Sequence, residues 1–309
     1  MGAIDLTKKR ILVTGGNGYL GRHLTAALTR AGAVVYVMDK YGDDHTPRHF
    51  ILDITDRKAV EDAVREIQPE IVFHLAASLN RERVFDRFDE TNAINTGGTL
   101  NLLLALKEVD YEHFIFTGTS EVYGGNVAPF TENQLPDPAS PYSLTKIYAE
   151  LLIKTFSKTY GKKYTVLRLF NFFGKNMSPQ FFIPQMIETF RKNETFNMTK
   201  GEQKRDFLYV DDVIKAMVLS ARHGGKNDVF NVCSGKGVSL KELALEIKNT
   251  LGSTSEINFG ALPYRENEVW NMTGDNTKIQ REFGFVPEYD LRSGIKAVIE
   301  GGAKMINKT

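Results

Sequence analysis

Short apolar segments of strand length alternate with segments of helical periodicity through the first half of the chain. Strands that alternate with helices predict βαβ units, in which a parallel sheet carries helices on both faces. Parallel strands are buried on both sides and therefore read as continuous apolar runs, as Ile-Val-Phe-His-Leu-Ala-Ala does here. The expected strands are Ile11–Thr14, Val34–Asp39, His49–Asp53, Ile71–Ala76, Phe114–Thr117 and Thr165–Phe170, and the expected helices are Leu20–Arg30, Asp56–Ile67 and Thr99–Val109.

The pattern loosens after Asn171. Aromatic and polar residues mix through Phe172–Asn197, and Gly260–Asp275 holds turn residues with little periodicity. A capping box at Ser239-Leu-Lys-Glu242 predicts one further helix. No Pro/Gly/Ser-rich linker separates the two parts. The sequence therefore predicts an α/β protein with a doubly wound parallel sheet in residues 1–170. A smaller mixed α/β part in residues 171–309 is expected to exchange some strands or helices with it.

Composition narrows the classes of function. The 309 residues are 42% hydrophobic and 25% charged, values of an ordinary globular protein. Lys and Arg number 39 against 38 Asp and Glu, so no basic surface for nucleic acid is expected. The single cysteine, Cys233, allows neither an intrachain disulfide nor a Cys-based zinc site, and the His spacing predicts no metal. With no membrane-length apolar run and no signal-peptide pattern at the start, we expect a cytoplasmic protein without membrane association.

Four glycines follow the first strand, in the sequence Gly15-Gly-Asn-Gly18-Tyr-Leu-Gly21, and Gly15, Gly18 and Gly21 have the spacing of a dinucleotide-binding turn. In a dinucleotide-binding turn, the first glycine allows the tight turn, the second lets the backbone approach a pyrophosphate, and the third lets helix pack closely on strand. The following helix offers free N–H groups and a partial positive charge to the phosphates. The turn therefore predicts a Rossmann-type cofactor site, with these contacting residues: Gly15, Asn17, Gly18, Tyr19 and Leu20.

The end of the second strand indicates which dinucleotide binds. Asp39 stands there, and a carboxylate at this place accepts hydrogen bonds from the ribose diol of NAD and repels the 2′-phosphate of NADP. Lys40 follows it, so NADP is less favoured rather than excluded. Asp53 and Ile54 close the third strand, where adenine could be held.

A second group of polar residues follows the strand Phe114–Thr117, in the sequence Thr119-Ser-Glu121-Val-Tyr-Gly124. Ligands of an open parallel sheet bind beyond the carboxyl ends of its strands. We therefore expect the hydroxyl groups of Thr119 and Ser120 and the carboxylate of Glu121 to face the cofactor cleft.

Further along, Ser140-Pro141 predicts the start of a helix that carries Tyr142 and Lys146 on one face. An adjacent Lys ammonium stabilises a Tyr phenolate and lowers the pKa of the phenol. Tyr142 can then take a proton from a substrate hydroxyl while hydride leaves the same carbon. The hydroxyl of Thr119 could hydrogen-bond the same substrate oxygen.

Together these motifs resemble the extended short-chain dehydrogenases/reductases that act on nucleotide sugars, and the resemblance covers nearly the whole chain. It rests on Gly15-x-x-Gly18-x-x-Gly21, His74-Leu-Ala-Ala77, Asn95-x-x-Gly98-Thr99, Thr119-Ser-Glu-Val-Tyr-Gly124, Tyr142-x-x-x-Lys146, Arg168-x-x-Asn171 and Arg205-Asp-Phe-x-Tyr-Val-Asp-Asp212.

The resemblance implies that NAD lies across the N-terminal part and that an NDP-sugar lies in the cleft against the C-terminal part. Tyr142 would be the acid/base, Lys146 would hold the nicotinamide ribose, and Thr119 would assist. The implied cofactor contacts also include Leu75, Ala76, Ala77 and Asn95, and the implied substrate contacts are Ser78, Asn171, Arg205, Arg265 and Glu268. Members of the family usually dimerise through a four-helix bundle, which here would use Thr99–Val109 and Tyr142–Tyr160.

The family resemblance leaves the reaction open. Its enzymes share oxidation of the C4 hydroxyl or the reverse reduction, and Glu121 matches the base of 4,6-dehydratases. Ser120 occurs at the neighbouring position in GDP-mannose dehydratases, whereas dTDP-glucose dehydratases have Asp. UDP-glucuronate decarboxylases also show Thr-Ser-Glu, with an Arg matching Arg205, but their segment around the catalytic Tyr differs. Several 4-keto-sugar reductases carry Ser-Glu as well.

We favour a C4 epimerase or a 4-keto-sugar reductase, because the chain is short for a 4,6-dehydratase. The alternatives are a dehydratase or decarboxylase that uses Glu121 and, from another class, a catalytically silent dinucleotide sensor. The tail Pro263-Tyr-Arg265-Glu-Asn-Glu268 resembles that of GDP-sugar enzymes, with Arg265 on the pyrophosphate and Glu268 on the ribose, and hints at GDP.

Three further features have simpler interpretations. His74 ends a buried strand and is expected to be a hydrogen-bonded core residue. The run Arg81-Glu-Arg83 with Arg87 is expected to be a solvated face rather than a substrate contact. The remaining feature is an aromatic cluster that is expected to form core and cleft wall: Phe170, Phe172, Phe173, Phe181 and Phe182.

Overall fold

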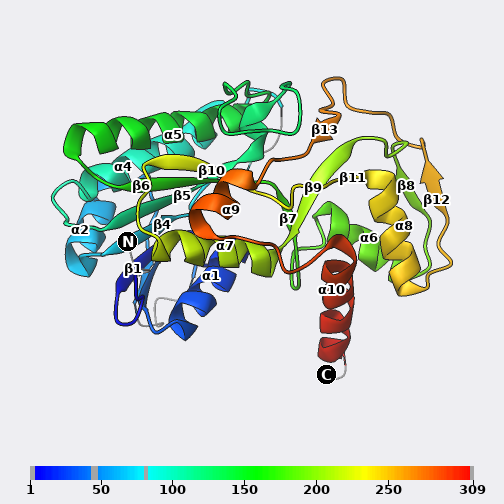
Figure 1. The fold of residues 1–309 in the computed structure, drawn as a ribbon, viewed down its shortest axis with the longest axis horizontal. Helices are drawn as coiled ribbons and strands as arrows, with labels where there is room; N and C mark the ends of the chain where they lie inside the picture. Colours follow the sequence, from blue (N-terminus) through cyan, green and yellow to red (C-terminus); the bar gives the residue numbers. More distant parts are fainter. Residues whose placement is uncertain (1–3, 43–47, 80–82, 307–309) are drawn as a thin grey trace.

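A seven-stranded parallel sheet forms the larger part of the molecule, in the order β10-β6-β5-β4-β1-β2-β3. The computed structural model describes residues 4–42, 48–79 and 83–306. Helices cover both faces of the sheet (Figure 1), which confirms the predicted doubly wound α/β fold. The strands are β1 (Arg10–Thr14), β2 (Val34–Asp39), β3 (His49–Ile51), β4 (Ile71–His74), β5 (His113–Thr119), β6 (Tyr164–Leu169) and β10 (Asp228–Val232).

Two apolar cores lie on the two faces of this sheet. Successive side chains of β1 alternate between them, with Ile11 and Val13 in one core and Leu12 in the other. The first core is closed by α1 (Tyr19–Arg30) and α7 (Val210–Arg222), and the second by α2 (Arg57–Ile67), α4 (Gly98–Ala105) and α5 (Pro141–Tyr160). Burial on both faces explains why these strands read as continuous apolar runs.

Two of the expected strands are shorter than predicted. β3 ends at Ile51 and β4 at His74, so the chain leaves the sheet before Asp53 and Ala76. The apolar residues beyond each strand end line the cleft instead of extending the strand. Apolar pattern alone cannot separate these two environments.

The helix expected over Thr99–Val109 begins much earlier. The helical segment consists of α3 (Phe88–Asn92), a π-helical turn (Ala93–Gly97) and α4. Gly98 lies inside it because a Cβ there would stand 2.5 Å from Cγ2 of Ile54. The glycine therefore serves close packing of the helix on the turn that follows β3, not a turn of its own.

The smaller part is built around β9 (Lys204–Tyr209), which pairs with β7 (Asn171–Phe173) and β13 (Asn271–Met272) in parallel and with β11 (Gly237–Ser239) in antiparallel direction. A separate pair joins β8 (Phe196–Met198) to β12 (Ile257–Phe259). The helices are α6 (Phe182–Arg191), α8 (Leu240–Leu251), α9 (Thr277–Phe283) and α10 (Leu291–Ile306). The predicted capping box opens α8, where Ser239 accepts from the Glu242 N–H at 3.1 Å and donates its own N–H to the Glu242 carboxylate at 2.8 Å.

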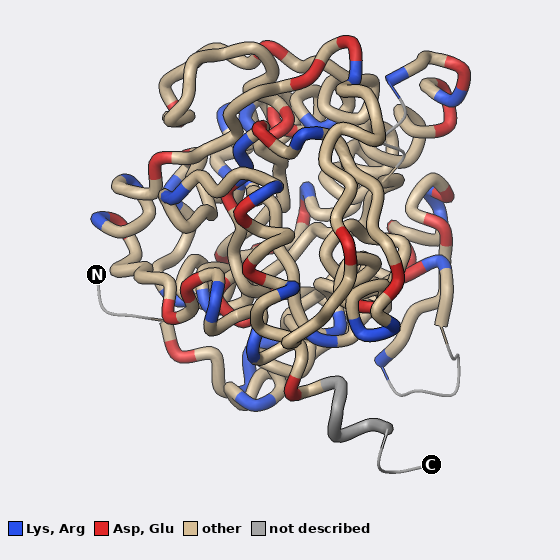
Figure 2. Tube along the Cα trace, turned by 90° about the vertical axis from the view of Figure 1, so that its right-hand side faces the viewer, with Lys and Arg blue, Asp and Glu red and all other residues tan. Residues whose placement is uncertain are grey.

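The chain crosses back from the smaller part into the larger one. After β9, α7 packs against α1, and β10 then joins the large sheet beside β6. Residues 171–309 are therefore not one contiguous body. The strands of the smaller part come both before and after α7 and β10 in the sequence. Lys and Arg are interspersed with Asp and Glu along the trace (Figure 2). Among the described residues, no helix has the length and apolar character needed to cross a membrane.

Candidate active site

A cleft of about 830 Å³ opens at the carboxyl edge of the large sheet, between the two parts of the molecule. It brings together residues from the carboxyl ends of six strands of the large sheet, the start of α5 and the smaller part. Of the residues singled out in the sequence, it is lined by Gly15, Asn17, Gly18, Tyr19, Leu20, Gly21, Asp39, Asp53, Ile54, Leu75, Ala76, Ala77, Ser78, Thr119, Ser120, Glu121, Tyr142, Lys146, Asn171, Arg205 and Arg265. Asn95 and Glu268 are not among its lining residues.

The glycine turn fits a dinucleotide phosphate. Gly15 has a φ of +69°, and a Cβ there would lie 2.8 Å from the backbone nitrogen of Ala76. A Cβ on Gly21 would overlap the Gly15 carbonyl and stand 2.6 Å from the Gly16 Cα. Helix α1 begins with Gly18 as its N-cap and no side-chain cap, so its first N–H groups face the cleft mouth uncapped. The turn is thus a backbone cradle that any side chain would fill.

Asp39 and Lys40 have separate partners at the end of β2. The Asp39 carboxylate accepts hydrogen bonds from the backbone N–H groups of Asn17 at 2.9 Å and Tyr41 at 3.1 Å. Lys40 instead pairs with Asp53 at 2.8 Å, and this hydrogen bond lowers the pKa of Asp53. Lys40, the cation nearest in sequence for pairing with a 2′-phosphate, is therefore already paired with the Asp53 carboxylate, which agrees with the preference for NAD.

Asn95 acts from behind the cleft. Its side chain is buried; Oδ1 accepts from the Ser78 N–H at 2.7 Å, and Nδ2 donates to Thr145 Oγ1 at 3.0 Å. It therefore ties the Ser78 backbone to α5. The cofactor contact that the resemblance implies for Asn95 stays a prediction.

The predicted catalytic helix begins as the sequence indicates. Ser140 caps α5 through the Ser143 N–H at 3.1 Å, Pro141 is its first residue, and Tyr142 and Lys146 both reach the cleft. Lys146 is 2% exposed, and its Nζ lies 4.1 Å from the centre of the Phe116 ring. Burial lowers the pKa of Lys146 to about 7.

The end of β5 supplies the remaining groups. Thr119 is its last residue, and its hydroxyl oxygen accepts a hydrogen bond from the Glu121 N–H at 3.2 Å. Ser120 and Glu121 follow in a short 3₁₀ turn that also borders the cleft. The hydroxyl, the carboxylate and the Tyr–Lys pair therefore share one cavity with the glycine turn, which is the arrangement that proton and hydride exchange at one carbon requires.

His74 is a hydrogen-bonded core residue, as the sequence predicts. Its Nδ1 lies 2.7 Å from Thr14 Oγ1 and its Nε2 2.9 Å from Thr99 Oγ1. Burial lowers the pKa of His74 to about 3, so its ring is neutral at physiological pH. It joins β4 to β1 and α4 beneath the cleft. No group of three or more metal-ligating side chains lies among the described residues.

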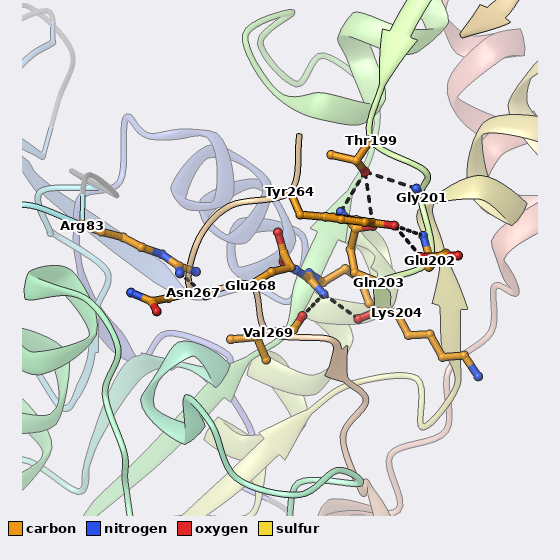
Figure 3. Close-up of polar contacts among 11 residues, drawn as sticks. Arg83, Thr199, Gly201, Glu202, Gln203, Lys204, Tyr264, Asn267, Glu268 and Val269 are labelled. Carbon is orange, nitrogen blue, oxygen red and sulfur yellow. Dashed lines mark hydrogen bonds and ion pairs between the residues drawn. The ribbon is translucent and has the colours of Figure 1, made fainter. Parts of the chain in front are cut away.

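On the substrate side, the segment 264–269 is held by side chains from three directions (Figure 3). Arg205 forms an ion pair with Glu268 and donates to the Val269 carbonyl at 2.7 Å. The Tyr264 hydroxyl donates to the Glu202 carboxylate at 2.9 Å and accepts from the Glu202 N–H at 3.2 Å. Glu268, expected on the nucleotide ribose, forms an ion pair with Arg205 in this structure.

Arg83 corrects one expectation. It borders the cleft and donates to the backbone carbonyl of Asn267, so it is not merely part of a solvated face. Burial lowers the pKa of Arg205, and the charges of Arg265 and Arg83 act in the same direction. The partner of Arg83 is far away in the sequence, and the local charge pattern gave no sign of it. Arg81 lies outside the described residues, and Arg87 pairs with Glu90 at 2.7 Å.

Asn171 and the aromatic residues form the opposite wall. The Asn171 Nδ2 is buried at the cleft and has no hydrogen-bond partner among the described residues, so a donor is open to a ligand. The predicted cluster divides: Phe173 is core, and the cleft wall is formed by Phe170, Phe172, Phe181 and Phe182. Sequence reasoning missed Met177, Ile183, Phe207 and Met272 in this wall, because apolar residues there have no signature beyond burial.

The comparisons with known proteins agree with this site. A sequence model of the NAD-dependent epimerase/dehydratase family matches residues 11–233. The structure of UDP-glucose 4-epimerase with UDP-glucose from Thermotoga maritima is 32% identical, covers 96% of this chain and 99% of its own, and superposes with a TM-score of 0.88.

Two relatives of other activities are nearly as similar. The GDP-6-deoxy-D-mannose reductase of Pseudomonas aeruginosa is 29% identical over 94% of this chain and 96% of its own length. The UDP-N-acetyl-alpha-D-glucosaminuronate decarboxylase of Bacillus cytotoxicus is 29% identical over 95% and 97%. The predicted class is thereby confirmed: this chain belongs to the NAD-dependent epimerase/dehydratase family, whose members of the extended short-chain dehydrogenase/reductase type modify nucleotide sugars.

Proposed function

We propose that the protein is a C4 epimerase of a UDP-sugar, and that the residues singled out in the sequence carry the roles expected of them. What carries the proposal is the sharing of one cleft by the glycine turn, Tyr142, Lys146 and Thr119, opposite an aromatic wall. Similarity to a UDP-glucose 4-epimerase over nearly the whole of both chains supports the choice among reactions.

The acid/base work falls to Tyr142. In this proposal its phenolate oxygen takes the proton of the C4 hydroxyl and later returns it, while the Thr119 hydroxyl donates to the same oxygen. NAD held on the glycine turn would supply the acceptor, and later the donor, of the C4 hydride. Lys146 stabilises the phenolate when protonated, and its lowered pKa keeps its proton readily exchangeable near neutral pH.

The substrate side binds the nucleotide diphosphate. Arg205 and Arg265 border the cleft and offer charge-assisted hydrogen bonds to phosphate oxygens, while the open Nδ2 of Asn171 donates to the sugar nucleotide. UDP is favoured over the GDP hinted at by the tail, on the similarity given above. The roles of Ser78 and Glu268 in substrate binding, of Asn95 and Asp53 in cofactor binding, and the cytoplasmic location stay predictions.

Replacing Tyr142 tests the acid/base role. Tyr142→Phe should lower epimerisation of UDP-glucose at least about a thousandfold while NAD stays bound, because the proton acceptor is lost and the site is otherwise intact. Product formation is followed by NMR of the sugar anomeric region. Wild-type-like turnover in Tyr142→Phe would rule out this role.

A second candidate function is elimination or decarboxylation with Glu121. The observation that favours it is the position of this carboxylate beside Thr119 at the cleft. Glu121→Gln should then abolish loss of water or CO₂ but retain C4 oxidation, seen as NADH absorbance on adding substrate. Unchanged product in Glu121→Gln supports the epimerase.

We also propose a homodimer through α4 and α5, which pack side by side. Leu100 on α4 and Tyr148 and Leu151 on α5 are exposed apolar side chains on this helix pair. Two such pairs would form the four-helix bundle expected from the family resemblance. Leu151→Glu should convert the dimer to a monomer in light scattering after gel filtration; a wild-type monomer would contradict the proposal.

A further inference from the structure

The most deeply buried ion pair among the described residues lies next to the catalytic helix positions. Glu150 stands one turn after Lys146 on α5 and faces Arg168 of β6. The Arg168 Nε donates to Oε1 at 3.2 Å and its Nη2 to Oε2 at 2.7 Å, with both side chains 5% exposed. The pair is therefore bidentate and nearly dry.

This pair supports the floor of the cleft. A Cβ on Gly118 would stand 2.8 Å from Glu150 Oε1, so the carboxylate lies directly behind the residue that precedes Thr119. The guanidinium carbon of Arg168 lies 4.9 Å from the centre of the Tyr123 ring. One pair of side chains thus connects α5, β5 and β6 at the level where Thr119 and Lys146 reach the cleft.

Stability does not explain the pair. A buried ion pair is generally no more stabilising than apolar side chains of the same volume. Here Arg168 Nη1 is in addition buried without a hydrogen-bond partner in the described part of the chain, which costs further free energy. The arrangement is therefore better explained by what it does for its neighbours.

The effect of the pair on its neighbours follows from the charges around Lys146. Tyr142 precedes it and Glu150 follows it by one turn of α5; the neutral His74 faces it from β4 and the Phe116 ring from β5, while Arg168 of β6 stands behind Glu150. The Glu150 carboxylate acts to raise the pKa of Lys146 against the larger effect of burial. Arg168 carries the opposite charge directly against this carboxylate and offsets its field.

We propose that Glu150 and Arg168 are positioning residues that hold the Tyr142–Lys146 helix against β5 and β6 and balance the field at these two side chains. The proposal rests on the proposed function, in which Tyr142 is the acid/base. Neither residue touches the cleft, and each acts only through the helix and its electrostatics.

Neutralising the two partners one at a time tests the field. Arg168→Met leaves a bare carboxylate and should raise the pH midpoint of Tyr142 ionisation by about one unit, while Glu150→Gln leaves a bare guanidinium and should lower it by about one unit. The double variant Glu150→Gln/Arg168→Met and the conservative Arg168→Lys should return to the wild-type midpoint. Ionisation is read from near-ultraviolet tyrosinate absorbance with NAD present, minus the same titration of a Tyr142→Phe background.

Opposite shifts in the two single variants support the proposal, and shifts in the same direction or an unmoved midpoint overturn it. If the single variants do not fold, the unfolding temperature and turnover of the neutral double variant still test the proposal. It should unfold at the wild-type temperature but turn over about tenfold more slowly, because the helix is no longer fixed to the strands. Wild-type turnover or a large loss of stability in it would overturn the proposal. Failure of the proposed function is distinct, since the wild-type enzyme would then show no turnover while the titrations remain readable.

Discussion

The two halves of the cleft are built by different means. On the cofactor side, the backbone of a short contiguous segment forms the turn expected to bind the phosphates, and Gly15 and Gly21 are required there because a Cβ has no room. On the substrate side, side chains from distant segments hold one another in place, as Arg205 holds Glu268 and Arg83 holds the Asn267 carbonyl. A backbone site allows almost no substitution, whereas a side-chain network can be retuned, which suits a family that keeps one cofactor and changes its sugar.

The buried cations of the two halves also differ in whether they have an ion-pair partner. Lys146 lies over the Phe116 ring without an ion pair among the described residues, and burial lowers its pKa to about 7. Arg205 keeps a carboxylate partner in Glu268. The cofactor side therefore holds a titratable group near neutral pH, and the substrate side holds a fixed positive charge for phosphate.

Breaking the backbone cradle should have the largest effect. Gly21→Ala places a Cβ against Gly15 and Gly16, and we expect NAD affinity to fall at least a hundredfold, since the turn must open to relieve the overlap. Binding is measured by calorimetry. Gly97→Ala is the matched control, because the nearest atom to its Cβ is 3.9 Å away; equal losses in both variants would contradict the cradle.

Removing the buried cation should change stability in a pH-dependent way. Because the pKa of Lys146 is lowered from 10.5 to about 7, the unfolded chain binds more protons than the folded one between these values, so wild-type stability falls as pH decreases from 10.5 to 7. At pH 7 the free energy of unfolding of Lys146→Met should exceed that of the wild type by a few kcal/mol, measured by denaturant unfolding. The variant should also lose the dependence of stability on pH between 7 and 10.5. A variant less stable than wild type at pH 7 would show that Lys146 is not penalised by burial.

Opening the substrate-side network should affect only the sugar nucleotide. Glu268→Gln removes the partner of Arg205 and frees segment 264–269, so we expect UDP affinity to fall about tenfold with NAD affinity unchanged. The exposed neighbour Glu266→Gln is the control and should bind UDP as the wild type does. Loss of NAD binding in Glu268→Gln would mean that the two halves are not independent.

The smallest effect is expected from the outer contact of the same segment. Tyr264→Phe removes two hydrogen bonds to Glu202 but keeps the ring against Trp270, where the ring centres are 4.8 Å apart. UDP affinity should fall by a factor of about five or less, as for a pair of partly exposed hydrogen bonds. A loss as large as that of Glu268→Gln would place the anchor of the segment at Tyr264.

What could be predicted from the sequence follows the same division. The turn at Gly15–Gly21, the cap at Ser140 and the Tyr142–Lys146 spacing are local, so residue type and periodicity were enough to find them. The contact of Arg83 with Asn267 joins residues 184 positions apart, and the pairing of Glu150 with Arg168 depends on which strand lies behind α5. Such contacts arise from topology, and no spacing in the sequence indicates them. Strand β10 was not among the strands expected from the sequence, and its place beside β6 likewise depends on topology.

The measurement that tests the central claim most directly is the fate of the C4 hydrogen. UDP-glucose carrying deuterium at C4 is incubated with the purified enzyme and its own bound NAD, without added cofactor. The account predicts the C4 epimer with deuterium retained at C4, because hydride leaves and returns within one cleft. A product lacking water or CO₂, or turnover that requires added NADH, would contradict the epimerase assignment.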